Sequence, residues 1–139
     1  MKMKVMLDPG ATMPLRAHEL DAGYDLYSRE DAVIYHGDSH CFDTGVHVAI
    51  PAGYVGMVKS KSGLNVKYNL VSEGVIDSGY TGSIVVKLYN HGNAAVHIEK
   101  GQKISQLVLL PIITPELDLV KSLEETERGT GGFGSTGAF

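Results

Sequence analysis

The sequence contains one cysteine, Cys41, among its 139 residues. A lone cysteine excludes an internal disulfide and a thiolate zinc site. No apolar run approaches the roughly 18 residues that indicate a membrane-spanning helix, and the first residues lack the apolar stretch of a signal peptide. We therefore expect a cytoplasmic protein in a reducing compartment, without a membrane partner.

Positive charge is also scarce. Lys and Arg total 12 against 16 Asp and Glu, which gives a net charge of −4. This balance argues against a nucleic-acid polymer or an anionic membrane as partner, but a small anion needs only a few local cations. The signatures of P-loop proteins, zincins and serine hydrolases are absent, and the six histidines lack metal-ligand spacing.

The pattern of turns predicts a single all-β domain. A chain of 139 residues fits one domain. Short runs of β-branched and aromatic residues are separated by glycine or proline, at turn spacings of about 8–12 residues, which is typical of a sandwich, jelly roll or small barrel. We expect strands near residues 2–7, 24–28, 32–35, 44–50, 54–59, 83–90, 94–98 and 103–111, and a short helix near 63–70. Within 83–90, Ile84, Val86 and Leu88 are expected to face one way.

Residues 128–137, Arg-Gly-Thr-Gly-Gly-Phe-Gly-Ser-Thr-Gly, combine five glycines with a cation, hydroxyls and one aromatic ring. Ordering ten residues costs on the order of 10–20 kcal/mol, and only Phe133 offers much apolar area in return. We predict a mobile arm that becomes ordered when a ligand supplies contacts, although a plain flexible tail fits the composition too. Guanidinium and hydroxyl groups suit phosphate oxygens, and a ring suits a base. The G-x-G-x-x-G match at 129–134 lacks the strand and helix of a dinucleotide site.

Four clusters in the body carry polar side chains beside turns. Asp25 follows a glycine bend, and residues 59–64 place two lysines and two serines before the expected helix, as in a phosphate site. Asp77 and Tyr80 are expected at the tip of a β-hairpin within residues 74–82, and Gln106 lies among apolar neighbours in residues 101–107. Each cluster alone also fits an ordinary surface turn or strand.

In order, these clusters and the arm resemble the five motifs of the trimeric deoxyuridine triphosphatase (dUTPase) family. The resemblance covers nearly the whole chain, and the matching segments are residues 22–28, 61–64, 74–82, 101–107 and 128–137. It implies the jelly-roll-like (β-clip) dUTPase fold with one short helix and a flexible C-terminal arm. We expect a body at residues 1–123, and a connector and Gly-rich arm at 124–139 that closes over the active site.

The resemblance also implies an activity. The chain would hydrolyse dUTP to dUMP and pyrophosphate, using Mg²⁺ and a water that attacks the α-phosphorus. This would limit uracil entry into DNA and supply dUMP for thymidylate synthesis. The enzyme would be a homotrimer whose active sites are shared between subunits.

The catalytic and nucleoside-binding positions follow from the resemblance. Asp77 is similar to the family's aspartate that orients the attacking water, and Tyr80 to the ring that packs under deoxyribose. Backbone groups near Gly74 would read uracil. Gln106 resembles a contact to phosphate and water, and Asp25 resembles the residue that holds magnesium-bound waters.

The remaining positions resemble the family's substrate contacts from two further segments. The arm would place Phe133 over the base and its polar groups on the phosphates. The residues concerned are Lys61, Ser62 and Gly63 before the helix, and Arg128, Phe133, Gly134, Ser135 and Thr136 in the arm.

Three positions depart from the family pattern. Lys61 stands where arginine is usual, Gly79 replaces a second aspartate, and Ser83 stands where an acid often follows Gly82. A lysine offers a point charge in place of the bidentate arginine fork. These departures put local contacts in doubt but leave Asp77 in place.

Two other functions stay open. Asp77-Ser-Gly79 resembles the turn of the related dCTP deaminase family, but Lys87 stands where that family has its catalytic glutamate, and that family lacks the arm. The second is a dUTPase-like binding or regulatory protein that contacts another macromolecule in a nucleotide-dependent way.

Overall fold

Eleven strands and one short helix make up residues 4–111 of the computed structural model, which describes residues 1–139. They are β1 (Lys4–Leu7), β2 (Gly23–Tyr27), β3 (Ala32–Ile34), β4 (Ser39–Asp43), β5 (Val46–Ala49), β6 (Tyr54–Ser60), α1 (Ser62–Tyr68), β7 (Leu70–Val71), β8 (Glu73–Ile76), β9 (Val85–Asn90), β10 (Val96–Ile98) and β11 (Lys103–Pro111).

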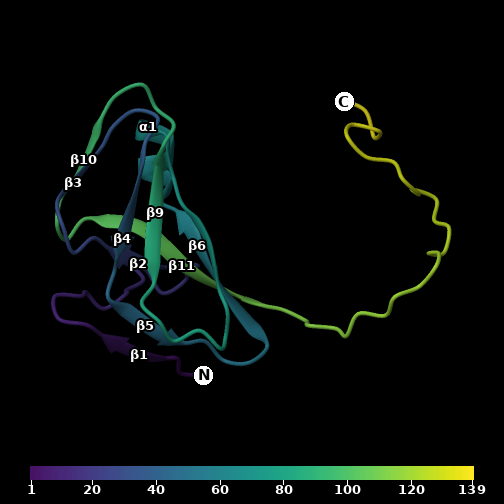
Figure 1. Cartoon of the computed structure of the whole chain (residues 1–139), viewed down its shortest axis with the longest axis horizontal. Helices are drawn as coiled ribbons and strands as arrows, with labels where there is room; N and C mark the ends of the chain where they lie inside the picture. The colour runs from purple at the N-terminus through teal and green to yellow at the C-terminus, as the bar shows by residue number, and fades with distance from the viewer.

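The strands form two larger antiparallel sheets and two strand pairs (Figure 1). One sheet has the order β2-β11-β6-β8 and the other β4-β9-β7, while β1 pairs with β5 and β10 with β3. The central strand β11 is paired on both sides, so that Gln106 lies opposite Asp25 of β2 and Lys59 of β6. The sheet thereby brings three polar positions side by side.

The core draws apolar side chains from both larger sheets. In and just before β9, Ile84, Val86 and Leu88 are at most 1% exposed, as their alternation predicts. Phe42 of β4 and Leu107 of β11 are buried with them in a single cluster of 15 residues. This core fixes the relative positions of the loops that carry the polar clusters.

The all-β, jelly-roll-like fold with one short helix is confirmed. The helix expected near residues 63–70 is α1, which ends where Asn69 adopts a left-handed φ of 54°. Strand β4 was not expected, because Ser, His, Cys and Asp dominate its sequence and only Phe42 is buried. No helix of the chain is long and apolar enough to cross a membrane.

The expectation of a β-hairpin around Asp77 is wrong. Strand β8 pairs with β6, whereas β9 pairs with β4 and β7. Residues 77–84, here called the Asp77 loop, begin with a tight turn in which the Tyr80 amide donates to the Asp77 carbonyl over 3.0 Å. The chain then docks against the start of β5 and the turn before it, because the Ile84 amide donates to the Val46 carbonyl and the Ile84 carbonyl accepts from the Thr44 amide. The loop therefore crosses between sheets.

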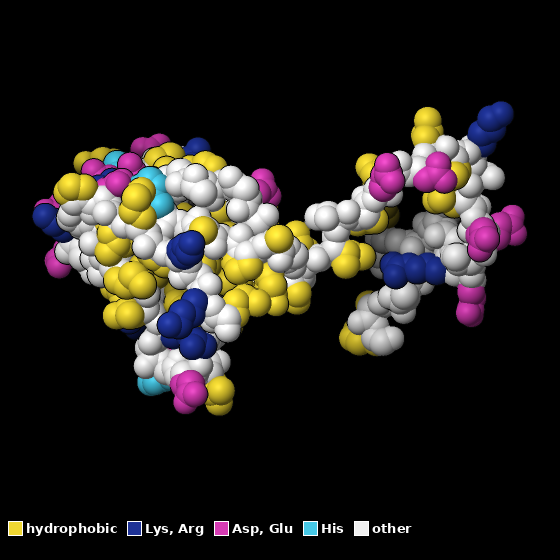
Figure 2. Space-filling model, turned by 90° about the horizontal axis from the view of Figure 1, so that it is seen from below, with side chains coloured by type: hydrophobic (Ala, Val, Ile, Leu, Met, Phe, Trp, Pro, Cys, Tyr) yellow, Lys and Arg dark blue, Asp and Glu magenta, His cyan; other side chains and the backbone are white.

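The C-terminal part of the chain leaves the body after β11. The Ile112 amide donates to the Gly53 carbonyl over 2.8 Å, and residues 112–139 contain no further strand or helix. This stretch extends away from the body with apolar and acidic side chains in the open (Figure 2). Leu117 and Leu119 are 93% and 99% exposed. The boundary expected after residue 123 stays a prediction.

The buried ring of Phe42 gives a test of the core. We expect Phe42→Ala to lower the free energy of unfolding by about 3–5 kcal/mol, because it removes a ring and leaves a cavity. Urea unfolding at one fixed protein concentration measures the change. Val66→Ala is the matched control, since Val66 is 79% exposed. Equal midpoints for the two variants would contradict this core assignment.

Candidate active site

A buried carboxylate between two lysines forms the first part of the site. Asp25 is 4% exposed, with Oδ1 at 2.5 Å from Lys61 Nζ and Oδ2 at 2.8 Å from Lys103 Nζ. Burial raises the pKa of Asp25, but the hydrogen bonds and charges of the two lysines outweigh it and hold the pKa below its ordinary value. The hydrogen bond between Lys103 and Asp25 raises the pKa of Lys103.

These residues line a polar cavity of about 280 Å³, together with Ser62 and Gln106. Gln106 Nε2 donates to the Ser60 carbonyl over 3.0 Å, which fixes its amide between β6 and β2. Gly23 of β2 makes room for that amide, because a Cβ at this position would overlap the Gln106 side chain. Four residues expected in the site thus line one cavity: Asp25, Lys61, Ser62 and Gln106.

The start of α1 adds backbone donors to this cavity. Lys61 is the N-cap residue and makes no side-chain capping bond. The first amides of a helix have no acceptor within the helix. The amides of the turn that begins at Ser62 are therefore free to donate to an acceptor outside it. No atom lies within 4 Å of where a Cβ of Gly63 would be, so the backbone there is open.

Asp77 and Tyr80 lie at a second, separate cavity of about 260 Å³, which Gly74 and Ser83 also line. Asp77 is exposed at the end of β8. The Tyr80 hydroxyl donates to the Ser83 carbonyl over 2.9 Å, and its ring lies so close to Gly82 that a Cβ there would overlap it. Because β8 is an edge strand, one row of its backbone groups has no partner strand.

The Asp77 cavity adjoins the middle of β6, where Val58 lines it, whereas the Asp25 cavity lies beyond the last residue of β6. Asp77 follows Ile76, which pairs with Gly56 near the start of β6, whereas Lys61 follows its last residue, Ser60. Gly56 and Ser60 are four positions apart, a rise of about 13 Å along the strand. The cavities share no lining residue. The chain alone therefore does not unite Asp77 and Tyr80 with the Asp25 cavity.

The arm forms a third group: it lies away from the body of the fold (Figure 1), and none of its residues lines either cavity. All its hydrogen bonds are local, such as the one from Arg128 Nε to the Gly131 carbonyl at 2.9 Å. Phe133 is fully exposed and adopts a left-handed φ of 51°, a conformation that non-glycine residues rarely adopt. Gly134, Ser135 and Thr136 are exposed beside it.

The family model described as dUTPase matches residues 10–137 of this chain. The chain belongs to the dUTPase family. The deoxyuridine 5'-triphosphate nucleotidohydrolase of Clostridium acetobutylicum is 42% identical over 134 residues, which cover 94% of this chain and 92% of that protein. The rat nucleotidohydrolase is 43% identical, and the match covers 96% of this chain and 65% of that protein.

Solved dUTPase structures have the same fold. A mutant dUTPase of Staphylococcus bacteriophage 80alpha with dUpNHpp matches with a TM-score of 0.92 and 36% identity, over 99% of both chains. A mutant dUTPase from phage phi11 of S. aureus, described with a structural Mg(II) ion, matches with a TM-score of 0.83 and 34% identity, over 89% of this chain and 99% of that one.

Lys103 is a member of the site that sequence reasoning missed. The pairing of β11 with β2 shifts between Lys103 and Ser105, which marks a β-bulge at Ile104. Strict alternation would place Lys103 on the face opposite Gln106. The bulge instead sets Lys103 opposite Tyr27, two residues from Asp25, and so on the same face as Gln106. No pattern in the sequence predicts this bulge.

The structure shows the surroundings of the three residues that depart from the dUTPase pattern. Lys61 binds the Asp25 carboxylate with its single ammonium group. No atom lies within 4 Å of a Cβ built at Gly79, so packing does not demand glycine there. The Ser83 hydroxyl donates to the Asp43 carboxylate, an internal link that ties the Asp77 loop to β4.

Removing Lys103 is expected to raise the pKa of Asp25. In Lys103→Met the buried carboxylate loses one hydrogen-bonded cation, so its ionised form is less favoured. Carboxyl carbon NMR titration measures the pKa directly. Lys100→Met is the control, because Lys100 is exposed and its side chain makes no bond to Asp25.

The lowered pKa of Asp25 also predicts how the stability of the fold changes with pH. Because the folded pKa of Asp25 is lowered, its contribution is present above the ordinary value of 3.8 and is lost as pH falls through the folded pKa. An Asp25 pKa unchanged in Lys103→Met would contradict the assigned contact.

Proposed function

We propose that this chain hydrolyses dUTP to dUMP and pyrophosphate. The observation that carries the proposal is the full-length match to the dUTPase family, with proteins of that name aligned over more than nine-tenths of both chains. The chain carries Asp25, the Asp77 loop and the arm in that order, in segments that resemble the family's motifs. Each of the three groups suits a different part of a nucleoside triphosphate.

The cavity at Asp77 suits the nucleoside. Unpaired backbone groups of edge strand β8 near Gly74 offer the donors and acceptors that a uracil edge needs. The ring of Tyr80 supplies a flat apolar surface for deoxyribose. Asp77 is exposed at the cavity, where its carboxylate can orient a water and take its proton as a general base.

The cavity at Asp25 suits the phosphates. Lys61 and the backbone of Ser62 and Gly63 offer a cation and amide donors, and Gln106 offers an amide for the phosphate or the attacking water. Lys61 is bound to Asp25 here, so phosphate binding exchanges one anionic partner for another.

The arm suits a role as a lid. Arg128, Ser135 and Thr136 carry donors for phosphate oxygens, Gly134 has an unobstructed backbone, and Phe133 offers a ring to the base. Closure of such a segment excludes water and strengthens every charge interaction beneath it.

The donor set at Asp25 fits Mg²⁺. This ion prefers oxygen ligands and is usually held by one or two carboxylates, retained waters and substrate phosphates. The chain has no group of three or more His, Cys, Asp or Glu that could hold a metal, but Asp25, Ser62 and Gln106 supply oxygens around one cavity. When bound, Mg²⁺ would neutralise phosphate charge, with Asp25 holding its waters.

We propose a homotrimer whose sites are shared between subunits. The two cavities and the arm lie apart in one chain, so a site that uses all three draws them from different chains. Apolar side chains of residues 112–123 support assembly, because Ile113, Leu117, Leu119 and Leu123 are 87–99% exposed and need cover.

We further propose a cytoplasmic location. Cys41 is exposed and unpaired, and an exposed thiol is best preserved in a reducing compartment. A human relative is described as mitochondrial, so the family is not confined to the cytoplasm.

The activity is tested by pyrophosphate release from dUTP, dCTP, dTTP and UTP, each with and without Mg²⁺. We expect release from dUTP, dependent on Mg²⁺. Asp77→Asn should lower kcat by about 10²- to 10⁴-fold, because it removes the general base while leaving most binding contacts. Asp38→Asn is the control, since Asp38 is exposed and its side chain makes no hydrogen bond. Wild-type turnover in Asp77→Asn would overturn the assignment.

Shared sites predict that two inactive variants restore each other. A chain ending at Glu127 lacks the arm and should fold normally but lose most turnover. Assembled together with Asp77→Asn chains at equal amounts, it should recover about a quarter of the wild-type rate, because half the chains supply Asp77 and half supply the arm.

The recovered rate is measured after joint refolding and compared with the two variants mixed as preformed assemblies. No recovery after joint refolding would argue that each chain completes its own site, whereas full activity of the shortened chain would show that the arm is dispensable.

A second function, nucleotide-dependent regulation through a protein partner, is favoured by one observation. A Staphylococcus bacteriophage 80alpha dUTPase, with a TM-score of 0.93 and 36% identity, is described in work on phage dUTPases that control transfer of virulence genes by a proto-oncogenic G protein-like mechanism. A partner whose binding depends on dUTP and on the arm, with no pyrophosphate release by the wild-type protein, would support this function over hydrolysis.

A further inference from the structure

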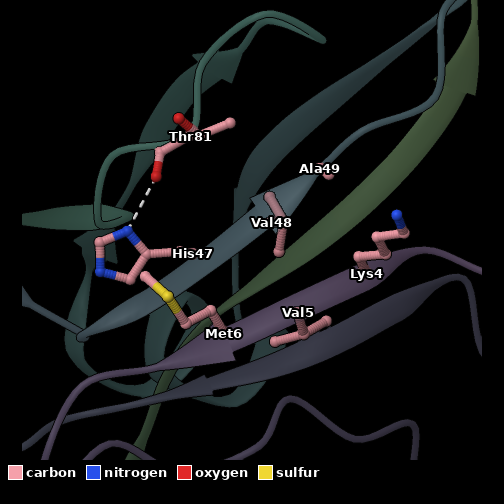
Figure 3. Close-up of a pocket in the computed structure, with 7 residues that line it drawn as sticks. All are labelled: Lys4, Val5, Met6, His47, Val48, Ala49 and Thr81. Atoms are coloured by element: carbon pink, nitrogen blue, oxygen red, sulfur yellow. Dashed lines mark hydrogen bonds between the residues drawn. The ribbon is translucent and has the colours of Figure 1, made fainter.

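Both ring nitrogens of His47 face hydrogen-bond acceptors, of which Figure 3 shows the Thr81 carbonyl. His47 lies on β5 opposite Met6 of β1. Its Nδ1 is 2.8 Å from the Thr81 carbonyl, and its Nε2 is 3.0 Å from Asp8 Oδ1. A carbonyl and a carboxylate oxygen only accept hydrogen bonds, so both contacts are satisfied together only when both ring nitrogens carry protons. The geometry calls for an imidazolium.

The charges around His47 favour the protonated ring. Asp8, just after β1, and Asp43, at the end of β4, are the nearby anions, while Arg29 pairs with Asp43 and Lys4 lines the same pocket. The Thr81 hydrogen bond, followed by that of Asp8, raises the pKa of His47, and partial burial opposes this only in part.

Thr81 belongs to the Asp77 loop and directly follows Tyr80. Three side-chain hydrogen bonds tie the later half of this loop to other strands: His47 to the Thr81 carbonyl, Ser83 to Asp43, and Thr44 to the Ile84 carbonyl. Only the His47 contact reaches the residue next to Tyr80. It is also the only one of the three whose donor changes protonation near neutral pH.

We propose that His47 is a positioning residue, which as an imidazolium ties Thr81 to the β1–β5 sheet and thereby holds Tyr80 and the Asp77 loop in their substrate-binding geometry. The inference rests on the proposed function, because it assigns Tyr80 and Asp77 to the nucleoside. It adds a pH-sensitive link between this loop and the N-terminal strand.

Loss of the proton weakens this link. A neutral imidazole keeps one N–H, so one of the two contacts then sets a nitrogen lone pair against an acceptor oxygen. Because the folded pKa of His47 is raised above 6.5, the stabilisation is fully present below that value and is lost as pH rises through the folded pKa. In either tautomer the continuous link from the Thr81 carbonyl through His47 to Asp8 is broken on the alkaline side, and we expect the loop to loosen.

The first test is the pH dependence of dUTP hydrolysis, with kcat and KM measured separately. In the wild-type protein KM should rise about two- to tenfold as His47 loses its proton, which is the effect of one hydrogen bond. His47→Gln should show the raised KM at every pH, without that inflection. Asp8→Asn should move the inflection to lower pH, because the ring loses an anionic partner.

His40→Gln is the matched control. His40 Nε2 also meets a carboxylate, Glu30 Oε1 at 2.9 Å, but neither residue touches the Asp77 loop. This variant should keep the wild-type profile. A His47→Gln profile that equals the wild-type profile, or an inflection that Asp8→Asn leaves in place, would overturn the proposal.

The second test does not depend on hydrolysis. NMR titration of the His47 ring is followed together with the backbone amides of Tyr80, Thr81 and Gly82. The amides should shift with the midpoint of His47 in the wild-type protein and not in His47→Gln. Amides that ignore the His47 midpoint would refute the link. Absence of dUTP hydrolysis with a coupled titration would instead refute the proposed function and leave the link intact.

Discussion

The ion pairs of Asp25 are the interaction on which the polar site depends. A carboxylate that is 4% exposed is costly to bury unless cations and hydrogen-bond donors compensate it. Lys61, which follows the end of β6, and Lys103, at the start of β11, supply these cations. Through Asp25 they fix the start of α1 to the start of β11. The cation cluster is thus assembled around its own anion before any ligand arrives. In the proposed function, a phosphate chain entering this cavity would meet charges that are already positioned.

The Asp77 loop, at the other cavity, is held in place by different interactions. Ile84 anchors the end of residues 77–84 in the core, while side chains of β4 and β5 hold Thr81 and Ser83 by hydrogen bonds. Asp43 is part of this arrangement, because its hydrogen bonds from Ser83 and the Gly45 amide, with the charge of Arg29, lower its pKa despite some burial. Polar anchoring suits a loop that must present Asp77 to solvent while staying in place.

Much of the fold could be predicted from the sequence, because alternation and turn residues report directly on local structure. Ile84, Val86 and Leu88 show this in β9, and β11 has the expected bounds. Strand pairing is not a local property, which is why residues 74–82 suggested a hairpin although β8 and β9 lie in different sheets. The residues of the site divide in the same way, into those that local motifs indicate and those that tertiary contacts bring in. Asp25, Lys61, Ser62 and Gln106 were expected together and meet in one cavity, whereas Lys103 and His47 act through tertiary contacts that no motif encodes.

The bulge at Ile104 divides β11 into two parts with different registers. The part before it presents Lys103 to the polar cavity, and the part after it sends Leu107 into the core. Alternation after the bulge already sets Gln106 in the polar cavity and Leu107 in the core, and the one-residue offset adds Lys103 to the same polar face as Gln106. Deleting Ile104 would leave Lys103 opposite Tyr27 and in regular alternation with Gln106, but it would remove a side chain that is fully buried in the core.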